Sequence, residues 1–346
     1  MQFKSLIFSS SIALFGAQLA LLLHLPLPWL MGPLLLTAVC RYSGLNLFCP
    51  AWCRKAGQWC IGSSLGLYFV PAIVTVLQDT MLLIAVAIAF ALWQDWFGAR
   101  MLVRFGGVGF KTAWFSSSVG GASEMSTLAE RYGAEVDKVA SAHSLRVLMV
   151  VVSIPFAFQY LGIHGSDASQ FGKNTLFDVW GLLALVLVTV GCAFIFQWRN
   201  WINPWVLGPL FASALLTLSG THWSAIPPEI QNLSQMFIGW SLGCKFGPDF
   251  FKRAPQFLAV VGVCNALALA ASVMVAYALS WVLPLSVPTL ILSLAPGGIT
   301  EMTITAKVLQ LGVPVVTTVQ VARMVCVLLV TGPLFHRLAR RQHEQD

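Results

Sequence analysis

The chain has 346 residues, of which 58% are hydrophobic and only 10% are charged, and its mean hydropathy is +0.79. Soluble proteins average about 25% charged residues, so this composition excludes an ordinary soluble domain and predicts a multi-pass membrane protein. The formal net charge of +7 does not indicate nucleic-acid binding. The basic residues lie in short gaps between apolar segments, where they anchor loops to one side of a membrane.

Apolar segments follow one another in the same order in each half of the chain. In the first half we expect them at 6–23, 29–40, 57–77, 81–97, a broken element at 112–131, and 139–161. In the second half we expect them at 176–196, 205–218, 233–246, 257–282, a broken element at 288–311, and 314–335. A spanning helix needs about 20 apolar residues. The second segment of each half is shorter and contains a Gly-Pro pair, and each broken element contains a Gly-Gly pair, which is typical of segments that line a transport site.

The two halves are an internal duplication. The sequence Gly-Gly-Ala-Ser-Glu-Met at 120–125 returns as Gly-Gly-Ile-Thr-Glu-Met at 297–302. Other landmarks return at nearly the same interval: 29–34 as 205–210, 61–66 as 238–243, and Arg146 as Arg323. We therefore divide the chain into two membrane repeats, 1–173 and 174–346. Such duplication in an apolar chain is typical of transport folds whose halves meet around a site near the bilayer midplane.

The distribution of charge predicts how the repeats insert. If each Gly-Gly element is a re-entrant hairpin, each half has about five transmembrane helices, and the odd number makes the second half inverted. The loops then placed inside carry most of the basic residues: Lys4, Arg41, Arg54, Lys55, Arg100, Arg104, Lys111, Arg131, Lys138, Arg199, Lys245, Lys252, Arg253, Arg337, Arg340 and Arg341. The positive-inside rule favours this arrangement over six crossings per half and places both termini in the cytoplasm. We expect the protein in the plasma (inner) membrane. Tryptophans at the expected segment ends agree with an interfacial belt: Trp93, Trp96, Trp198, Trp201 and Trp223.

The broken elements carry the candidate site residues. Two glycines are expected to free the backbone to turn, and a short helix should begin just after them, offering unpaired N–H groups and partial positive charge to an anion. The residues concerned are Gly120, Gly121, Ser123 and Glu124 in the first copy and Gly297, Gly298, Thr300 and Glu301 in the second. The alternative is a Gly-Gly kink that only lets two helices cross closely.

The helix after each broken element contains a deep arginine. Arg146 and Arg323 lie about seven to ten residues inside their segments, where a guanidinium costs on the order of 3 kcal/mol. Each needs a partner, which is either Glu124 or Glu301 in an ion pair, or a carboxylate-like group of a substrate. His143 lies one helical turn before Arg146 and has Gln320 as its counterpart. It is either a proton relay, together with Glu124 and Glu301, or a hydrogen-bonded helix residue.

These features resemble the bacterial AbrB family of duplicated membrane proteins, which is distinct from the soluble DNA-binding regulator of the same name. The resemblance rests on the repeated Trp-x-x-Gly-Pro-Leu segments, the Gly-Gly elements, and the Arg146-Val147-Leu148 and Arg323-Met324-Val325 sequences, and it covers essentially the whole chain. It implies little about chemistry, because members are labelled as ammonia monooxygenases or as regulators of gene expression. Paired-glycine hairpins in an inverted repeat resemble, more distantly, elevator-type secondary transporters. The two copies also differ at the residue before the glycines, since Val119 stands where Pro296 stands.

We therefore expect an all-α polytopic membrane protein with an inverted repeat that acts as a secondary transporter of a small, anionic organic solute. The solute would lie between the two Gly-Gly tips and the buried arginines, with H⁺ or Na⁺ as the coupling ion. The alternative is a membrane protein that regulates gene expression through solute sensing. We expect no enzyme, no cofactor and no metal site, because the histidines lack the spacing of metal ligands. The expected partners are the solute and the lipid bilayer, without nucleic acid, and a homodimer is left open.

Overall fold

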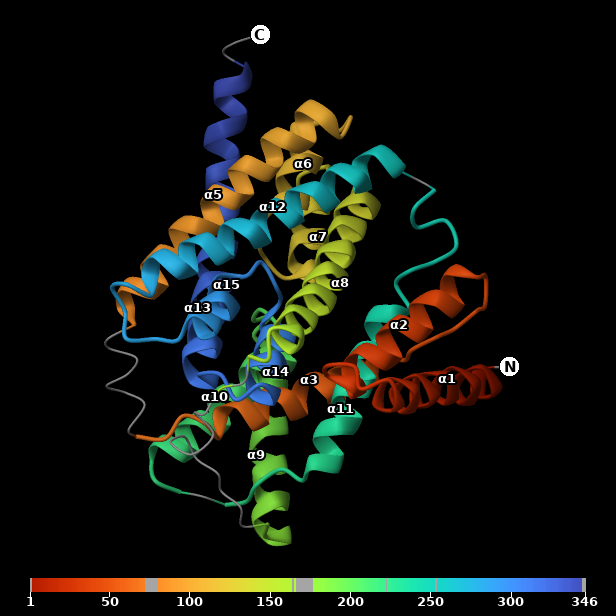
Figure 1. The fold of residues 1–346 in the computed structure, drawn as a ribbon, viewed down its shortest axis with the longest axis vertical. Coiled ribbons are helices and arrows are strands. Elements are labelled where there is room, and N and C mark those ends of the chain that lie inside the picture. Colours follow the sequence, from red (N-terminus) through yellow and green to blue (C-terminus); the bar gives the residue numbers. More distant parts are fainter. Residues whose placement is uncertain are drawn as a thin grey trace. The chain divides into compact units, whose positions relative to one another are not determined.

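The computed structural model describes residues 2–71, 80–163, 165, 177–221, 223–252 and 254–343, with the side chains of 2–4, 123 and 336–343 excepted. These residues form helices and no strand. In the first half the helices are α1 (Gln2–Leu22), α2 (Pro28–Tyr42), α3 (Ala51–Gly66), α5 (Met81–Phe105), α6 (Phe110–Ser117), α7 (Ala122–Arg131) and α8 (Val136–Tyr160). In the second half they are α9 (Val179–Trp198), α10 (Pro204–Leu218), α11 (Pro228–Gly243), α12 (Pro255–Leu279), α13 (Val287–Leu294), α14 (Ile299–Val308) and α15 (Val313–His343) (Figure 1).

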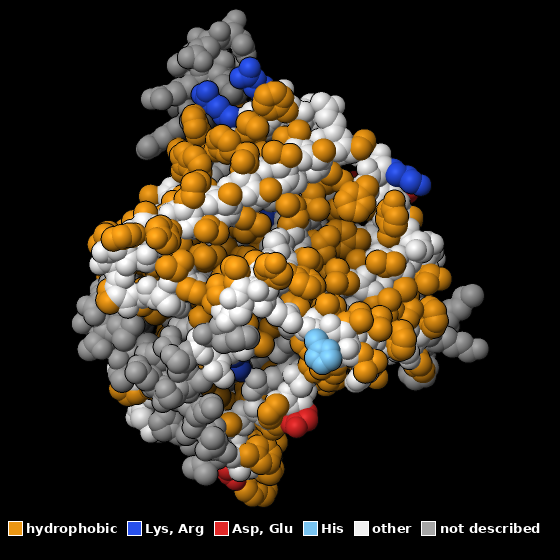
Figure 2. All heavy atoms as spheres, viewed as in Figure 1, with side chains coloured by type: hydrophobic (Ala, Val, Ile, Leu, Met, Phe, Trp, Pro, Cys, Tyr) orange, Lys and Arg blue, Asp and Glu red, His pale blue; other side chains and the backbone are white. Residues whose placement is uncertain are grey.

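Six of these helices are long and apolar enough to cross a membrane. They are α1, α5 and α8 in the first half and α9, α12 and α15 in the second, which confirms the prediction of a multi-pass, all-helical membrane protein. Hydrophobic side chains predominate on the face shown in Figure 2, and charged ones are few. The remaining predicted crossings are shorter, since α2 and α10 have 15 residues and α3 and α11 have 16. They fall short of the roughly 20 residues that a lipid-exposed span needs.

The helix α5 is longer than the predicted segment at 81–97. It continues to Phe105 and ends where Gly106 and Gly107 follow, the latter with a φ of +64°, because a left-handed glycine stops helix propagation. Trp93 and Trp96 therefore lie within the helix and not at its end. The Arg100 guanidinium lies 4.8 Å from the centroid of the Trp96 ring.

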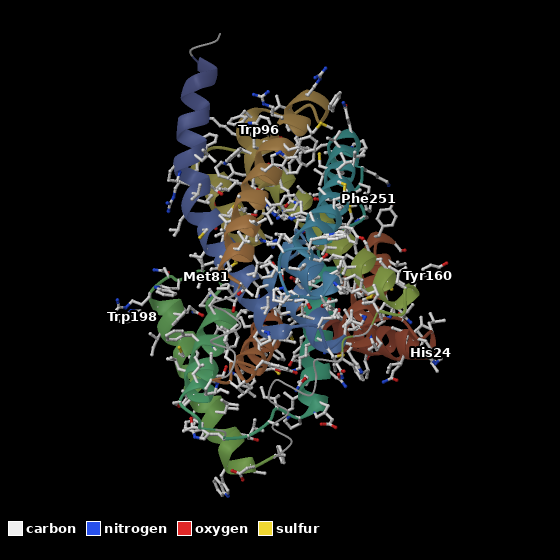
Figure 3. The ribbon with its side chains drawn as sticks, turned by 60° about the vertical axis from the view of Figure 1, so that its left-hand side comes forward. His24, Met81, Trp96, Tyr160, Trp198 and Phe251 are labelled. Atoms are coloured by element: carbon white, nitrogen blue, oxygen red, sulfur yellow. The ribbon has the colours of Figure 1, made fainter. Side chains whose placement is uncertain are left out.

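Two other aromatic side chains do lie at helix ends. Tyr160 ends α8 and is 91% exposed, and Trp198 ends α9 and is 77% exposed (Figure 3). Amphipathic rings at the ends of apolar helices are typical of the membrane interface.

The chain folds into two compact units that do not coincide with the two sequence repeats. The first unit contains residues 1–76, 152–250 and 303–314, and the second contains 77–151, 251–302 and 315–346. Helices α1–α3 and α9–α11 thus belong to the first unit, and the broken elements and the helices beside them belong mainly to the second. Each unit is built from corresponding parts of both halves.

In the first unit, the short helices of one half pack against those of the other. Gly62 of α3 meets the carbonyl oxygen of Val206 in α10, and Gly239 of α11 meets that of Leu30 in α2, so closely that a Cβ on either glycine would clash with it. The two contacts are counterparts in the duplication, because Gly62 corresponds to Gly239 and Leu30 to Val206. Small residues let helices approach to backbone contact in a membrane, so the duplication extends from the sequence to the packing.

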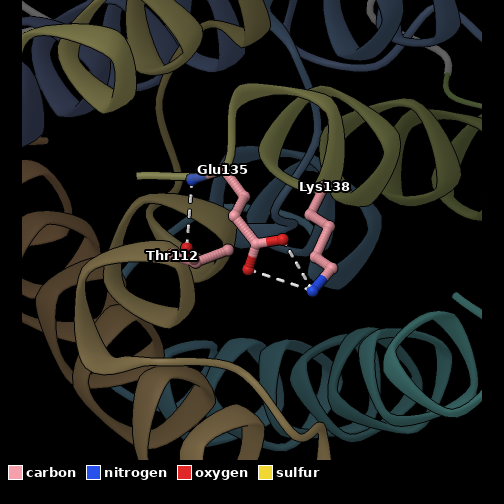
Figure 4. Close-up of polar contacts among 3 residues, drawn as sticks. All are labelled: Thr112, Glu135 and Lys138. Atoms are coloured by element: carbon pink, nitrogen blue, oxygen red, sulfur yellow. Dashed lines mark hydrogen bonds and ion pairs between the residues drawn. The ribbon is translucent and has the colours of Figure 1, made fainter. Parts of the chain in front are cut away.

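In the second unit, the first broken element doubles back. Its arms are α6, of 8 residues, and α7, of 10 residues, which are about 12 and 15 Å long. The backbone N–H of Glu135, just after α7, donates to the Thr112 hydroxyl in the first turn of α6 at 3.1 Å (Figure 4). The rings of Phe115 and Tyr132 stack at 5.3 Å across the same two arms. The element therefore ends beside the point at which it began.

The segment after this hairpin carries a surface ion pair. Lys138 and Glu135 approach to 2.8 Å and both side chains remain partly solvated. Exposed pairs of this kind contribute little to stability.

Candidate functional site

Arg146, the deep arginine of the first half, caps the C-terminal end of the short helix α6. The Arg146 guanidinium donates from Nη1 to the carbonyl oxygens of Ser117 and Ser118 at 3.1 and 2.9 Å, and from Nη2 to that of Gly120 at 3.4 Å. These carbonyls lie at or just after the last turn of α6, where helix carbonyls have no intrahelical donor. A positive charge there also opposes the negative end of the helix dipole. Arg146 is only 5% exposed, so the short helix supplies the partner that a buried guanidinium requires.

The second half repeats this arrangement. Arg323 donates to the carbonyl oxygens of Leu294, Ala295 and Gly297 at 3.2, 2.7 and 3.0 Å. Each of these acceptors is the repeat counterpart of one that Arg146 uses in the first half. The guanidinium fork was expected to contact either a glutamate or a solute carboxylate. The structure instead directs both forks to backbone carbonyls.

The glutamates lie on the other side of each break. Glu124 and Glu301 are each the third residue of a helix, and their carboxylates lie against Gly121 and Gly298. A carboxylate in the first turn is favourable because it faces the positive end of the helix dipole. At each tip an arginine therefore binds the carbonyls at the end of the first short helix. A glutamate lies in the first turn of the second short helix. Thr300 is buried beside Glu301, and the side chain of Ser123 lies outside the described residues.

Side chains fold back closely over the paired glycines. None of the four has a left-handed φ, and Gly121 has an extended conformation at −64°, 138°. A Cβ on Gly121 or Gly298 would meet the following glutamate carboxylate, and one on Gly120 or Gly297 would meet a methionine side chain. The left-handed conformation that favours glycine is therefore not used at either tip, and the glycines leave room for the side chains that cover it.

His143 and Gln320 perform the same task in the two halves. The Nδ1 atom of His143 lies 2.5 Å from Nη2 of Arg146, and its Nε2 atom lies 3.0 Å from the carbonyl oxygen of Phe115. A guanidinium can only donate and a carbonyl can only accept, so His143 is neutral with its proton on Nε2. Gln320 accepts from Arg323 and donates to the carbonyl oxygen of Leu292 at 2.7 Å, which is the same pair of contacts. The geometry favours the hydrogen-bonded role of His143 over the proton relay.

Asp95 is a central residue that the sequence analysis missed. It lies within α5, is fully buried, and accepts a hydrogen bond at Oδ1 from the backbone N–H of Val119 at 2.7 Å. Its carboxylate interacts electrostatically with both Arg146 and Arg323, and its Oδ2 atom has no hydrogen-bond partner among the described residues. An acidic residue inside an apolar segment was the available signal, because intramembrane ionisable groups are functional by default.

A cavity of about 210 Å³ lies beside these groups in the second unit. Its wall is mostly apolar, from α5 and α12, with a few polar side chains. The polar ones are Gln94, Ser116, Ser117, Arg146 and Asn265.

Several of these polar atoms lack a protein partner. The Gln94 carbonyl and the Ser116 hydroxyl have no hydrogen-bond partner in the described part of the chain. Val119 and Pro296, one from each tip, line the same cavity. Of the predicted site residues, Arg146 lines the cavity directly, and the others lie at the two tips. An apolar cavity with a few converging polar groups and a buried positive charge can hold a small amphipathic anion.

Comparison with known proteins places this architecture in a family. The family described as "AbrB: Transition state regulatory protein AbrB" matches residues 29–339. The chain is 25% identical to the "Uncharacterized protein YhjN" of Bacillus subtilis (strain 168), covering 96% of this chain and 92% of that protein. It is 26% identical to the "Putative regulator AbrB" of Escherichia coli (strain K12), covering 92% and 91%. No solved structure matches the chain. The match over most of the sequence shows that the chain belongs to the AbrB family of membrane proteins.

Proposed function

We propose that the protein is a secondary transporter of a small organic anion, and that the solute binds in the cavity of the second unit. The cavity beside Arg146 is the observation that carries this proposal. Its wall is mostly hydrocarbon, it contains the buried guanidinium of Arg146, and no aspartate or glutamate is among its lining residues. A singly charged organic anion would therefore meet a positive charge and an apolar wall in the same place.

The composition of the cavity supports an organic anion over an inorganic one. Most of its wall is hydrocarbon, which suits the carbon skeleton of a carboxylate or similar solute. Gln94, Ser116 and Asn265 contribute polar side chains to the same wall, which suits hydroxyl or amine groups of the solute. Because the forks of Arg146 and Arg323 bind carbonyls, the arginines attract the solute mainly by their charge.

The arrangement of the repeats supports alternating access. Inverted repeats with interrupted helices place substrate sites at the meeting point of the halves, and the second unit contains the Gly-Gly pairs of both halves. We propose the second unit as the one that carries the solute, with the repeats inserted in opposite directions. Glu124 and Glu301 are the candidates to carry a coupling proton, since each lies at a tip.

Uptake into liposomes tests this function. Purified protein should accumulate one or more mono- or dicarboxylates or amino acids under a pH or Na⁺ gradient, above the level of protein-free liposomes. Replacing Arg146 with glutamine should abolish uptake, because it removes the charge beside the cavity. Arg199→Gln removes an exposed arginine at the end of α9 and is the matched control, with uptake retained.

The alternative is a role in regulating gene expression, which the names of the family and of the Escherichia coli relative favour. Regulation would then follow from the solute that the protein senses or moves. If folded wild-type and Arg146→Gln proteins are equally silent over a broad panel of anions, sensing becomes the better proposal.

A further inference from the structure

The first unit holds a partly buried cation that the proposed transport site does not use. Lys307 lies in the last turn of α14, in the part of this helix that belongs to the first unit. Its ammonium group donates a hydrogen bond to the Ser64 hydroxyl of α3 and lies 5.7 Å from the centroid of the Tyr68 ring. An ammonium group has three donors, so these contacts leave part of its hydrogen-bonding capacity unused.

A small cavity of about 20 Å³ adjoins this lysine. Three helices line it with these residues: Cys60, Ile61, Ser64 and Leu65 from α3, Gln231 and Gln235 from α11, and Ile304 and Lys307 from α14. The lining contains no aspartate or glutamate. The polar groups that it contributes beside the ammonium are a hydroxyl, a thiol and two amides. Lys307 is partly withdrawn from water, and a charge that is partly desolvated gains from a nearby countercharge, so this lining favours an anion from solution.

The cavity is not a by-product of the duplication. In the alignment of the halves that pairs Gly120 with Gly297, Lys307 corresponds to Glu130 and Gln231 corresponds to Arg54. The shared scaffold explains the close glycine contacts of these helices, but it does not explain Lys307 and Gln231, for which the first half has Glu130 and Arg54.

We propose that Lys307, Ser64 and Gln235 form a binding site for a small monovalent inorganic anion of about the size of chloride. The lysine supplies the charge. The Ser64 hydroxyl accepts from Lys307, so its own proton is free to point at the anion, and the Gln235 amide supplies N–H donors. The Gln231 amide donates to the carbonyl oxygen of Ile226 at 2.7 Å, which fixes its side chain at the wall. A cavity this small holds one or two water-sized spheres, so a carboxylate solute is too large for it.

Thermal unfolding of the purified full-length protein in detergent tests the site. Sodium chloride is titrated against sodium gluconate at equal ionic strength. In the wild type, chloride should raise the midpoint of unfolding by about 2–4 °C in a saturable manner, as a ligand that binds only the folded state does. Lys307→Gln should abolish the rise.

Gln235→Glu keeps the lysine and tests the charge argument directly. A carboxylate next to Lys307 would replace the anion, so the variant should fold and lose the chloride response. Gln58→Glu makes the same change at the corresponding position of the first half, away from the cavity, and should keep the response. A wild type that unfolds at the same temperature in chloride and gluconate overturns the proposal, as does a Gln235→Glu variant that still responds. Because the measurement is binding in detergent, its outcome is independent of solute uptake.

Discussion

The carboxylate of Asp95 and the backbone N–H of Val119 form a hydrogen bond of 2.7 Å, and the second half has replaced both partners. Val119 corresponds to Pro296, which has no N–H to satisfy. Helices α5 and α12 have 25 residues each and occupy the same place in their repeats. Aligned from their first residues, they pair Asp95 with Leu269. The two replacements compensate each other, because a tip without a donor needs no acceptor. This accounts for the difference between Val119 and Pro296.

The correspondence of α5 with α12 is also visible in their packing. Gly98 of α5 contacts Ser117, and the hydroxyl of Ser272 in α12 contacts the carbonyl oxygen of Leu294 at 3.4 Å. The two contacts join counterpart positions of the two halves. The first tip is therefore held to α5 by a charged hydrogen bond, and the second tip packs without one.

The first prediction replaces Asp95 and Val119 of the first half with the residue types that the second half has at these positions, leucine and proline. Asp95→Leu should destabilise the protein by about 1–3 kcal/mol, because it leaves the Val119 N–H buried without an acceptor. Adding Val119→Pro removes that donor and should recover on the order of 1 kcal/mol. Unfolding midpoints of the two single variants and the double variant measure the coupling. A double variant no more stable than the sum of the single effects would contradict the assigned role of this hydrogen bond.

The second prediction concerns His143. Because Gln320 makes the same two contacts in the second half, His143→Gln should retain stability and solute uptake, and the dependence of uptake on pH between about 5 and 8 should be unchanged. His143→Leu removes both contacts and should cost about 2–3 kcal/mol. Uptake measured across that pH range separates the alternatives: a His143→Gln variant that has lost its pH dependence would restore the proton relay.

The third prediction compares the two arginines. Lysine keeps the charge but lacks the planar fork that reaches several carbonyls at once, so Arg146→Lys and Arg323→Lys should destabilise the protein to a similar extent, by about 1–3 kcal/mol each. Only Arg146 lines the cavity. Arg146→Lys should therefore raise the KM for uptake more than Arg323→Lys does. Equal changes in KM would place the solute equally close to both guanidiniums and would contradict the proposed position.

The sequence predicts the repeat, the broken elements and the depth of the arginines, because these depend on local composition and on an interval that can be counted. It does not predict the partners of the arginines. Nothing in the spacing of Arg146 and Ser117 along the chain shows that a helix end folds back onto the guanidinium. The end of α5 was missed because Arg100 and Arg104 read as loop residues, whereas a helix continues through charged residues near an interface until glycine stops it. Asp95 was missed because it has no acidic counterpart in the second half, whereas the predicted site consists mainly of residues that recur in both halves.

The last prediction tests the insertion of the repeats. The charge distribution places Lys111, before the first hairpin, inside, and Pro284, before the second, outside. Single cysteines introduced at these exposed positions into a cysteine-free background should react with a membrane-impermeant thiol reagent from opposite sides. Arg131, at the far end of the first hairpin, provides the control. Because the Thr112–Glu135 hydrogen bond brings the two ends of that hairpin together, a cysteine at 131 should be labelled from the same side as one at 111. Labelling of 111 and 131 from opposite sides would mean that the element crosses the membrane, and labelling of 111 and 284 from the same side would mean that the repeats are parallel.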